Sequence, residues 1–269
     1  MDVQNAFLQG NLNEEIYMEL PSGLHNQGEH QSKHDYTLFT KQQDMLFINL
    51  LVYVDDILII GNDNKAINSL KTYLHQTFRI KDLEEPKYFL GIEVARTSSG
   101  ILLSQRKYVL ELISDSGLSG CKPNSIPIEQ NTKLTSQEFN DSTKSPKEDP
   151  QLQDHSKCQR LVVRLIYLII TRPDINYVVQ ILSQFMHSPK QSHMDAVIKV
   201  VKYLKGSLRL GLFLKGNLDL TTFCDSDWGS YPMTRKSLTG FCIKLGKSLI
   251  SWKTKKTIHS ISIFSRGRI

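Results

Sequence analysis

The sequence has no apolar run long enough to cross a membrane. Charged side chains interrupt the two best candidates among its 269 residues, at Asp55 and Asp56 in the first and at Arg164 in the second. A membrane-spanning helix needs about 20 consecutive apolar residues. The first residues also lack the basic and apolar regions of a secretory signal peptide. These absences predict an intracellular protein, cytoplasmic or nuclear, that has no membrane partner.

Cysteine is scarce and widely spaced. The four residues, Cys121, Cys158, Cys224 and Cys242, form no Cys-x-x-Cys pair. This spacing excludes the disulfide framework of small secreted proteins, so the thiols are expected to be reduced. With 15 glycines, 9 prolines and 40% hydrophobic residues, the composition also excludes collagen-like and low-complexity chains and favours a globular fold.

Acidic residues are missing from the last part of the chain. Residues 228–269 contain nine of the 33 Lys and Arg side chains and no Asp or Glu, so the formal net charge of +6 arises in this segment. Such a segment is either an ordinary solvated face or a surface that contacts the phosphates of nucleic acid. The sequence leaves both interpretations open.

The first half of the chain alternates strand pairs with helices. Residues 46–60 form two β-branched apolar runs that predict a hairpin with Asp55 and Asp56 at its tip. Asp63 is expected to cap a helix whose apolar face extends to Phe78. A second hairpin is expected on either side of residues 97–100, and Ser104 is expected to cap a helix that follows it.

The second half begins with a polar segment. Residues 119–157 are rich in Pro, Ser, Thr and Lys, and we interpret them as a linker. Three helices are expected after it and then a set of strands. The helices are expected at 161–170, 175–186 and 194–204, and the strands at 212–214, 220–224, 240–245 and 248–252. This order of elements predicts the α+β class.

The adjacent carboxylates of Asp55 and Asp56 need an explanation, because like charges inside an apolar segment repel each other where little water screens them. One explanation is an exposed turn, for which aspartate is a common residue. The other is a divalent cation, since Mg²⁺ prefers carboxylate oxygens. The residues alone do not decide between the two.

Several motifs resemble one family. Tyr53-Val-Asp-Asp between two apolar strands resembles the metal-binding hairpin of reverse transcriptases, and residues 2–18 resemble the segment that carries the first catalytic aspartate of copia-type retrotransposon polymerases. Four further stretches resemble that family in the same order along almost the whole chain. They are residues 88–94, 104–108, 172–175 and 234–241.

The resemblance implies an RNA-directed DNA polymerase with a partial right-hand palm and thumb. Asp2, Asp55 and Asp56 would be its catalytic residues and would bind two Mg²⁺ ions, and Tyr53 would lie beside the primer end. The implied partners are an RNA or DNA template-primer and deoxynucleotide triphosphates. The catalysis would be a two-metal nucleotidyl transfer.

The resemblance also divides the chain into functional parts. Residues 1–118 would be a partial palm, 119–157 the polar linker, 158–210 a helical thumb or connection, and 211–269 a truncated ribonuclease H-like α/β segment. In the last part, Asp225 would be the remnant of a metal ligand at the end of a strand. Without the family, the sequence Asp-Ser-Asp at 225–227 would be interpreted as a turn.

Three departures from the family pattern imply a defective fragment. Only Met1 precedes Asp2, so no palm strand is expected to position that carboxylate. After residues 19–23, a basic and aromatic Ser-Leu-Tyr-Gly-Leu-Lys-Gln-type segment is absent. Residues 257–269 stand where the family has the helix with the catalytic glutamate of ribonuclease H, and we interpret them as the product of a shifted reading frame.

Other functions stay open at this point. The chain could be a non-catalytic nucleic-acid-binding remnant whose phosphate contacts come from the basic residues Arg235, Lys236, Lys253, Lys255 and Lys256. It could also be an enzyme fragment that larger pieces complete in trans, or the helices at 161–204 could be an interaction module. Nothing in the sequence specifies an oligomeric state.

Overall fold

The computed structural model describes residues 2–3, 29–31, 37–78, 80–130, 132–143, 149–216, 219–227 and 237–257. The chain forms two compact units, an N-terminal unit, Met1–Leu90, and a C-terminal unit, Gly91–Ile269. The functional divisions expected at residues 118, 157 and 210 do not coincide with this boundary and stay predictions.

The N-terminal unit is built on an antiparallel sheet. The strands follow the order β2-β3-β4-β5-β1-β6 across the sheet. Their bounds are β1 (Asp2–Val3), β2 (Glu29–Gln31), β3 (Leu38–Gln43), β4 (Leu46–Tyr53), β5 (Asp56–Gly61) and β6 (Ile80–Lys81). β4 and β5 confirm the hairpin that the apolar runs predicted. The short strand β7 (Tyr88–Phe89) ends this unit.

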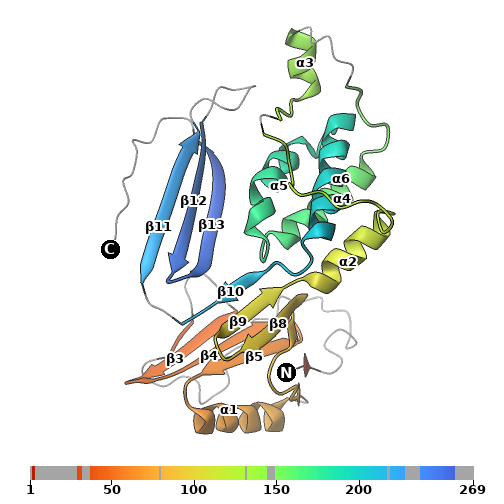
Figure 1. Ribbon diagram of the computed structural model, residues 1–269. Coiled ribbons are helices and arrows are strands. Elements are labelled where there is room, and N and C mark those ends of the chain that lie inside the picture. Colours follow the sequence, from red (N-terminus) through yellow and green to blue (C-terminus); the bar gives the residue numbers. More distant parts are fainter. Residues whose placement is uncertain are drawn as a thin grey trace, which may run out of the picture. The chain divides into compact units, whose positions relative to one another are not determined.

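Helix α1 (Asn64–Thr77) packs against this sheet and makes a small core with it (Figure 1). The buried residues Leu50, Leu74 and Ile80 form its centre. Asp63 is the N-cap, as predicted, and its carboxylate accepts the backbone N–H of Lys65 at 2.9 Å. Phe78 was expected on the apolar face, but it is the C-cap and 40% exposed, since the chain leaves the helix there.

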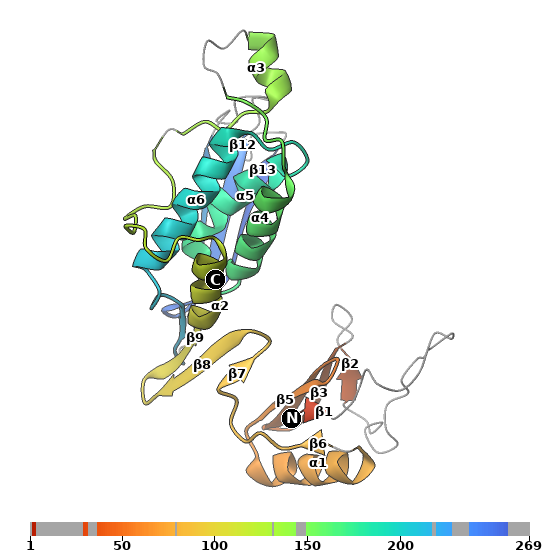
Figure 2. The same cartoon turned by 90° about the vertical axis from the view of Figure 1, so that its right-hand side faces the viewer.

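The C-terminal unit has a helical core made of α2 (Arg106–Asp115), α4 (Ser156–Leu168), α5 (Asn176–Leu182) and α6 (Gln191–Gly206). Short 3-10 turns at Pro173–Ile175 and Ser183–Phe185 flank α5, and α3 (Gln137–Thr143) projects beyond these helices (Figure 2). Ser104 is not the cap of α2, because Gln105 occupies that position and Glu93 Oε1 accepts the N–H of Lys107.

Two antiparallel sheets complete this unit. The first contains β8 (Ile92–Thr97), β9 (Gly100–Ser104) and β10 (Leu212–Leu214) in the order β10-β9-β8. The second contains β11 (Leu220–Asp227), β12 (Ser237–Leu245) and β13 (Ser248–Thr257) in sequence order. The mixture of helices and antiparallel sheets is compatible with the α+β class. The palm, thumb and ribonuclease H-like descriptions stay predictions.

The segment expected to be a linker follows helix α6 in the reverse direction. We call the described parts of residues 118–152 the strap. Near the end of α6, Lys205 Nζ donates to the carbonyl of Cys121 at 2.7 Å, and in the next turn back Lys202 O accepts the N–H of Asn124. Farther back, the Lys199 ammonium pairs with Glu129. The strap is therefore held to α6 at successive turns.

The start of α6 carries a buried ion pair with the strap. The Lys190 side chain is fully buried, and its Nζ lies 2.8 Å from Asp149 Oδ2. Asp149 also accepts the N–H and the hydroxyl of Ser192. Burial raises the pKa of Asp149, but the bonds from Lys190 and Ser192 outweigh it and hold this pKa below its usual value.

His193 lies beside this ion pair. Its Nδ1 accepts the Lys190 N–H at 3.0 Å, and its ring stacks on Phe185. Burial and the positive charge of Lys190 lower the pKa of His193 to about 4. The folded protein thus keeps this imidazole neutral over a pH range in which the same histidine is protonated in the unfolded chain.

Replacing His193 by Gln tests this linkage. In the wild type, the free energy of unfolding should be lost as pH falls from about 6.5 to about 4, because only the unfolded histidine binds a proton there. The loss should total on the order of 3 kcal/mol. Urea unfolding at a series of pH values should show a flatter profile for His193→Gln in this window. Equal slopes for the two proteins would contradict the assignment.

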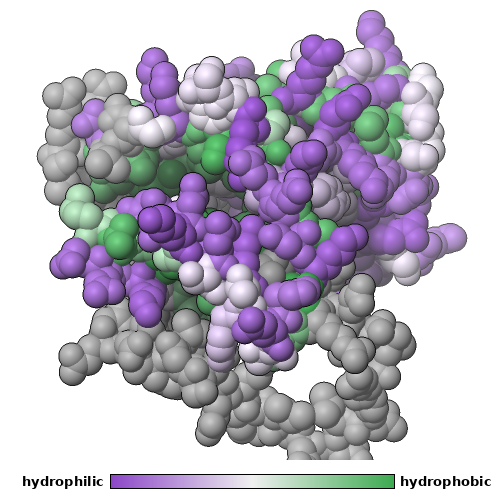
Figure 3. All heavy atoms as spheres, turned by 90° about the horizontal axis from the view of Figure 1, so that it is seen from below, coloured by the Kyte–Doolittle hydropathy of each residue, from purple (hydrophilic) through white to green (hydrophobic). Residues whose placement is uncertain are grey.

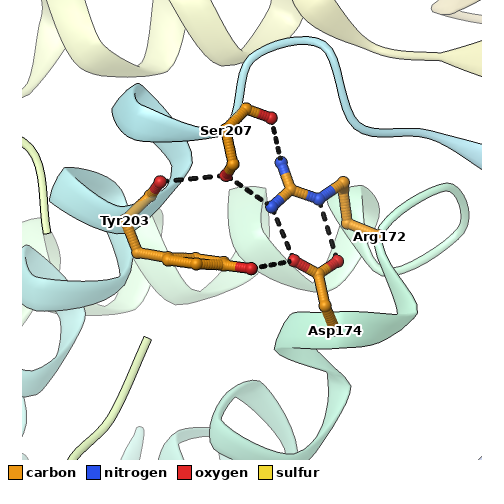
Figure 4. A network of polar contacts seen from close by, with 4 residues as sticks. All are labelled: Arg172, Asp174, Tyr203 and Ser207. Atoms are coloured by element: carbon orange, nitrogen blue, oxygen red, sulfur yellow. Dashed lines mark hydrogen bonds and ion pairs between the residues drawn. The ribbon is translucent and has the colours of Figure 1, made fainter. Parts of the chain in front are cut away.

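A second polar cluster joins the start of α5 to the end of α6 (Figure 4). The buried Arg172 guanidinium donates to both carboxylate oxygens of Asp174, at 2.9 and 2.6 Å, and to Ser207 O at 3.1 Å. Tyr203 donates its hydroxyl to Asp174 at 2.7 Å. Burial raises the pKa of Asp174, but the Arg172 and Tyr203 bonds outweigh it and lower this pKa.

Removing the Arg172 charge should destabilise the protein strongly. Arg172→Met leaves the Asp174 carboxylate without its cation and Ser207 O without the guanidinium donor, which should lower the free energy of unfolding by about 3 kcal/mol. Arg164→Met is the matched control, because Arg164 pairs with Asp115 at 2.6 Å but that carboxylate is 61% exposed. The control should lose less than about 1 kcal/mol in urea unfolding. Similar losses in the two variants would contradict this account.

Hydrophilic residues predominate on the described surface that Figure 3 shows, with small hydrophobic patches among them. Among the residues that the structure describes, no helix has the length and apolar character that a membrane crossing requires.

Candidate functional site

The two adjacent aspartates lie at the tip of the β4–β5 hairpin. Tyr53 pairs with Asp56, so Val54 and Asp55 form a two-residue turn and Asp56 begins β5. Tyr53 and Val54 are 52% and 56% exposed, whereas the two aspartates are half-buried. The tip is therefore open to solvent, as the simpler interpretation of the sequence required, and its carboxylates can be reached by a ligand.

Val54 has a backbone conformation that is unfavourable for its residue type. Its φ is +53°, in the left-handed region that two-residue hairpin turns favour and that glycine, asparagine or aspartate usually occupies. For a β-branched residue this conformation costs on the order of 1–3 kcal/mol. Asp44 has the same φ in the β3–β4 turn, but aspartate tolerates it better. The turn beside the two aspartates thus stores strain.

Asp2 is brought to the same corner of the sheet by its backbone. β1 lies between β5 and β6, and Asp2 faces Asp56 on one side and Lys81 on the other. The expectation that no strand would position Asp2 is therefore wrong, because Asp2 and Val3 themselves form one. The side chain of Asp2 lies outside the described part of the chain.

Strand alternation sets the direction of Asp56. Along β5, Ile57 and Ile59 pack toward α1, so Asp56 and Leu58 belong to the opposite face of the sheet. A carboxylate on that face is not buried among the apolar side chains that pack under α1. The site and the core of the N-terminal unit therefore use different faces of one hairpin.

The three acidic positions fit a magnesium site by the chemistry of their donors. Asp55 and Asp56 are neighbours, Asp2 faces Asp56, and carboxylate oxygens are the ligands that Mg²⁺ prefers. Among the side chains that the structure describes, no group of three His, Cys, Asp or Glu residues could hold a metal ion. The side chain of Asp2, which would be the third ligand here, is not among them.

The other predicted site residues lie in the C-terminal unit or outside the description. Asp225 is exposed on β11 and pairs with Gly240, and Lys253 is exposed on β13. Lys255 and Lys256 belong to β13, but their side chains lie outside the described part. Arg235 and Lys236 lie outside the described residues altogether.

Sequence reasoning missed Lys81, the cation whose backbone faces Asp2 across β6. A two-residue strand is too short to show an alternating pattern, so the sequence carries no clear signal for it. The position matters because a lysine beside the acidic corner changes the charge around any bound phosphate.

This hairpin is found in a known class of enzymes. The family model described as reverse transcriptase (RNA-dependent DNA polymerase) matches residues 29–130, which include the hairpin and α1. No solved structure matches the chain.

Similar proteins identify the group of reverse transcriptases to which the chain is related. The chain is 36% identical to the Retrovirus-related Pol polyprotein from transposon RE1 of Arabidopsis thaliana and 32% identical to that from transposon TNT 1-94 of Nicotiana tabacum, over 95% of its length in each case. It is also 41% identical to the uncharacterized mitochondrial protein AtMg00810 of Arabidopsis thaliana, over 77% of this chain and 82% of that protein. The chain therefore belongs to the reverse transcriptase family of copia-type retrotransposon Pol polyproteins.

The chain corresponds to only part of these polyproteins. It spans 19% of the RE1 protein and 22% of the TNT 1-94 protein. The RE1 alignment extends over 292 positions, which is more than the 269 residues of this chain. Some positions of that relative therefore have no counterpart here.

Replacing Val54 by Gly tests the strain at the turn. Because glycine adopts positive φ without steric cost, Val54→Gly should raise the free energy of unfolding by about 1 kcal/mol. Asp44→Gly, at the same φ in the β3–β4 turn, is the control and should change it by less. Thermal unfolding of both variants measures the difference. An equal or larger gain for Asp44→Gly would refute the strain at Val54.

Proposed function

We propose that the N-terminal unit is the palm of an RNA-directed DNA polymerase whose Asp2, Asp55 and Asp56 hold two Mg²⁺ ions. One observation carries the proposal, which is the strand pairing that sets Asp2 opposite Asp56 beside the Asp55 turn. The substrates are a template-primer and deoxynucleotide triphosphates, as in the family. When bound, the ions activate the primer 3′-hydroxyl and stabilise the charge on the triphosphate.

The residues of the hairpin have separate tasks in this palm. The two-residue turn fixes the carboxylates of Asp55 and Asp56 relative to the strands, and the strained Val54 keeps that turn tight. The exposed Tyr53 offers a ring beside the primer end. Asp2 supplies a ligand from the neighbouring strand, so the site depends on pairing between residues far apart in the sequence.

We also propose that this palm is defective in polymerisation. The segment that the family uses to position nucleotide and template is absent after residues 19–23, and an alignment longer than the chain supports an internal loss. Misplacing a substrate by about 1 Å costs on the order of a hundredfold in rate. The chain by itself therefore binds metal but does not sustain polymerisation.

The proposal also assigns roles to two parts of the C-terminal unit. Residues 158–210 would be the helical thumb or connection, and residues 211–269 a ribonuclease H-like segment. Three antiparallel strands with Asp225 on the first of them support the second assignment. Asp225 would be the remnant of a metal ligand in that segment.

Metal binding and primer extension test the two parts of the proposal separately. Titration of the full chain with Mn²⁺, followed by electron paramagnetic resonance, should show binding that Asp55→Asn weakens at least tenfold. Asp44→Asn changes an aspartate in the neighbouring β3–β4 turn and should bind like the wild type. Primer extension on an RNA template should give no incorporation above that of Asp55→Asn.

Each result has a defined meaning. If Asp55→Asn and Asp44→Asn bind Mn²⁺ equally, the proposed metal site is wrong. If the wild type extends the primer and Asp55→Asn does not, the palm assignment stands and the defect is wrong.

A second candidate function is a nucleic-acid-binding remnant that uses the basic C-terminal segment. The exposed Lys253 on β13 favours it, because a lysine on an accessible strand can contact phosphates. Such binding should not need Mg²⁺ and should weaken steeply as salt is added. Binding that is equally weak at low and high salt would count against this function.

A further inference from the structure

The sheet of β11, β12 and β13 has two different faces. Thr254 of β13 accepts a hydrogen bond from Asn176 of α5 at 3.1 Å, so the face that carries Thr254 is directed toward the helices. We call it the helix-side face and the opposite one the outer face. Because side chains alternate along a strand, the pairing register assigns each residue to one of the two.

The register places Asp225 and the Phe241–Lys253 pair on opposite faces. Asp225 pairs with Gly240, which pairs with Thr254, so Asp225 belongs to the helix-side face. Cys224 pairs with Phe241, which pairs with Lys253, and these three belong to the outer face. The exposed Asp225 and the exposed Lys253 therefore lie on opposite faces of the sheet.

The middle of the outer face is accessible. Phe241 is 37% exposed, and Cys224 and Lys253 on the strands beside it are exposed as well. Lys253 lies directly opposite Phe241, at the spacing of neighbouring strands. An aromatic ring is thus bordered by positive charge.

This arrangement suits one kind of ligand. An exposed aromatic ring on a sheet can stack on an unpaired base, and a neighbouring lysine can contact the phosphate of that nucleotide. A duplex hides the faces of its bases inside the stack, so it could use only the lysines. Because residues 228–269 contain no acidic residue, strands β12 and β13 themselves add no negative charge to repel a polyanion.

We propose that the outer face of the β11–β13 sheet is a binding platform for single-stranded nucleic acid, on which Phe241 stacks with a base and Lys253 contacts a phosphate. The proposal rests on the second candidate function and gives it a location and a ligand class. It is independent of Asp55 and Asp56, which lie in the other unit.

Fluorescence anisotropy with labelled oligothymidylate and oligouridylate tests the platform, using the full chain with EDTA present. Phe241→Ala should weaken binding roughly tenfold, the typical effect of losing one stacked base. Phe223→Ala is the matched control, because Phe223 is 40% exposed on the same sheet but belongs to the helix-side face, and it should bind like the wild type. Phe241→Tyr keeps a ring and should restore binding.

Salt dependence tests the lysine separately. Lys253→Gln should reduce the slope of log affinity against log salt by about 0.7, the value for one phosphate contact on a single strand. Lys244→Gln is its control, because the Lys244 ammonium lies over the Phe223 ring, 5.5 Å from its centroid, on the helix-side face. The control should leave the slope unchanged.

Three results would overturn the platform. Equal losses for Phe241→Ala and Phe223→Ala would place binding elsewhere while leaving the second candidate function intact. If a duplex binds as tightly as the single strands and Phe241→Ala has no effect on its affinity, the interaction is electrostatic only and no base stacks on the sheet. No binding of any oligonucleotide at low salt would remove both the platform and the second candidate function, without affecting the proposed palm.

Discussion

The two-residue turn at Val54 and Asp55 is the constraint on which the N-terminal unit depends. A turn of this length leaves one register for β4 and β5, and that register directs Leu50 and Ile59 toward α1 while Asp56 takes the other face. A shift by one residue would exchange the two faces and place a carboxylate in the core. Core packing and the acidic corner are therefore fixed together by one local geometry.

The C-terminal unit depends on helix α6 in a comparable way. In the sequence, the lysines of this helix look like a basic surface. In the structure, Lys190 and Lys199 form ion pairs with the strap, and Lys205 donates hydrogen bonds to its carbonyls. They hold a polar segment against the helices instead of facing a polyanion. The charge that remains accessible on this unit includes Lys253 of β13, and the nucleic-acid proposal is centred there.

Some local features could be predicted from the sequence, although the cap at Ser104 was not among them, and distant ones could not. The hairpin at 46–60 and the cap at Asp63 follow from residues a few positions apart, and both are confirmed. The strand at Asp2 is two residues long, and the residues with which it pairs lie more than fifty positions away in the sequence. No local sequence pattern therefore predicts it. The strap has the composition of a linker, because carbonyl and ion-pair contacts with α6 need few apolar residues. The metal site and the platform are proposals that the folded geometry sharpened.

The strap also sets the order in which the chain can fold. Its bonds join residues separated by 43 positions at Asp149 and Ser192 and by 84 positions at Cys121 and Lys205. Contacts of such long range form slowly, because the loop between them must close first. During synthesis the strap emerges well before α6, so its first partners appear only at Lys190 and Ser192, and its last, Lys205, is added at the end of the helix. The C-terminal unit therefore completes its core only late in translation, and until then the segment is accessible to proteases and chaperones.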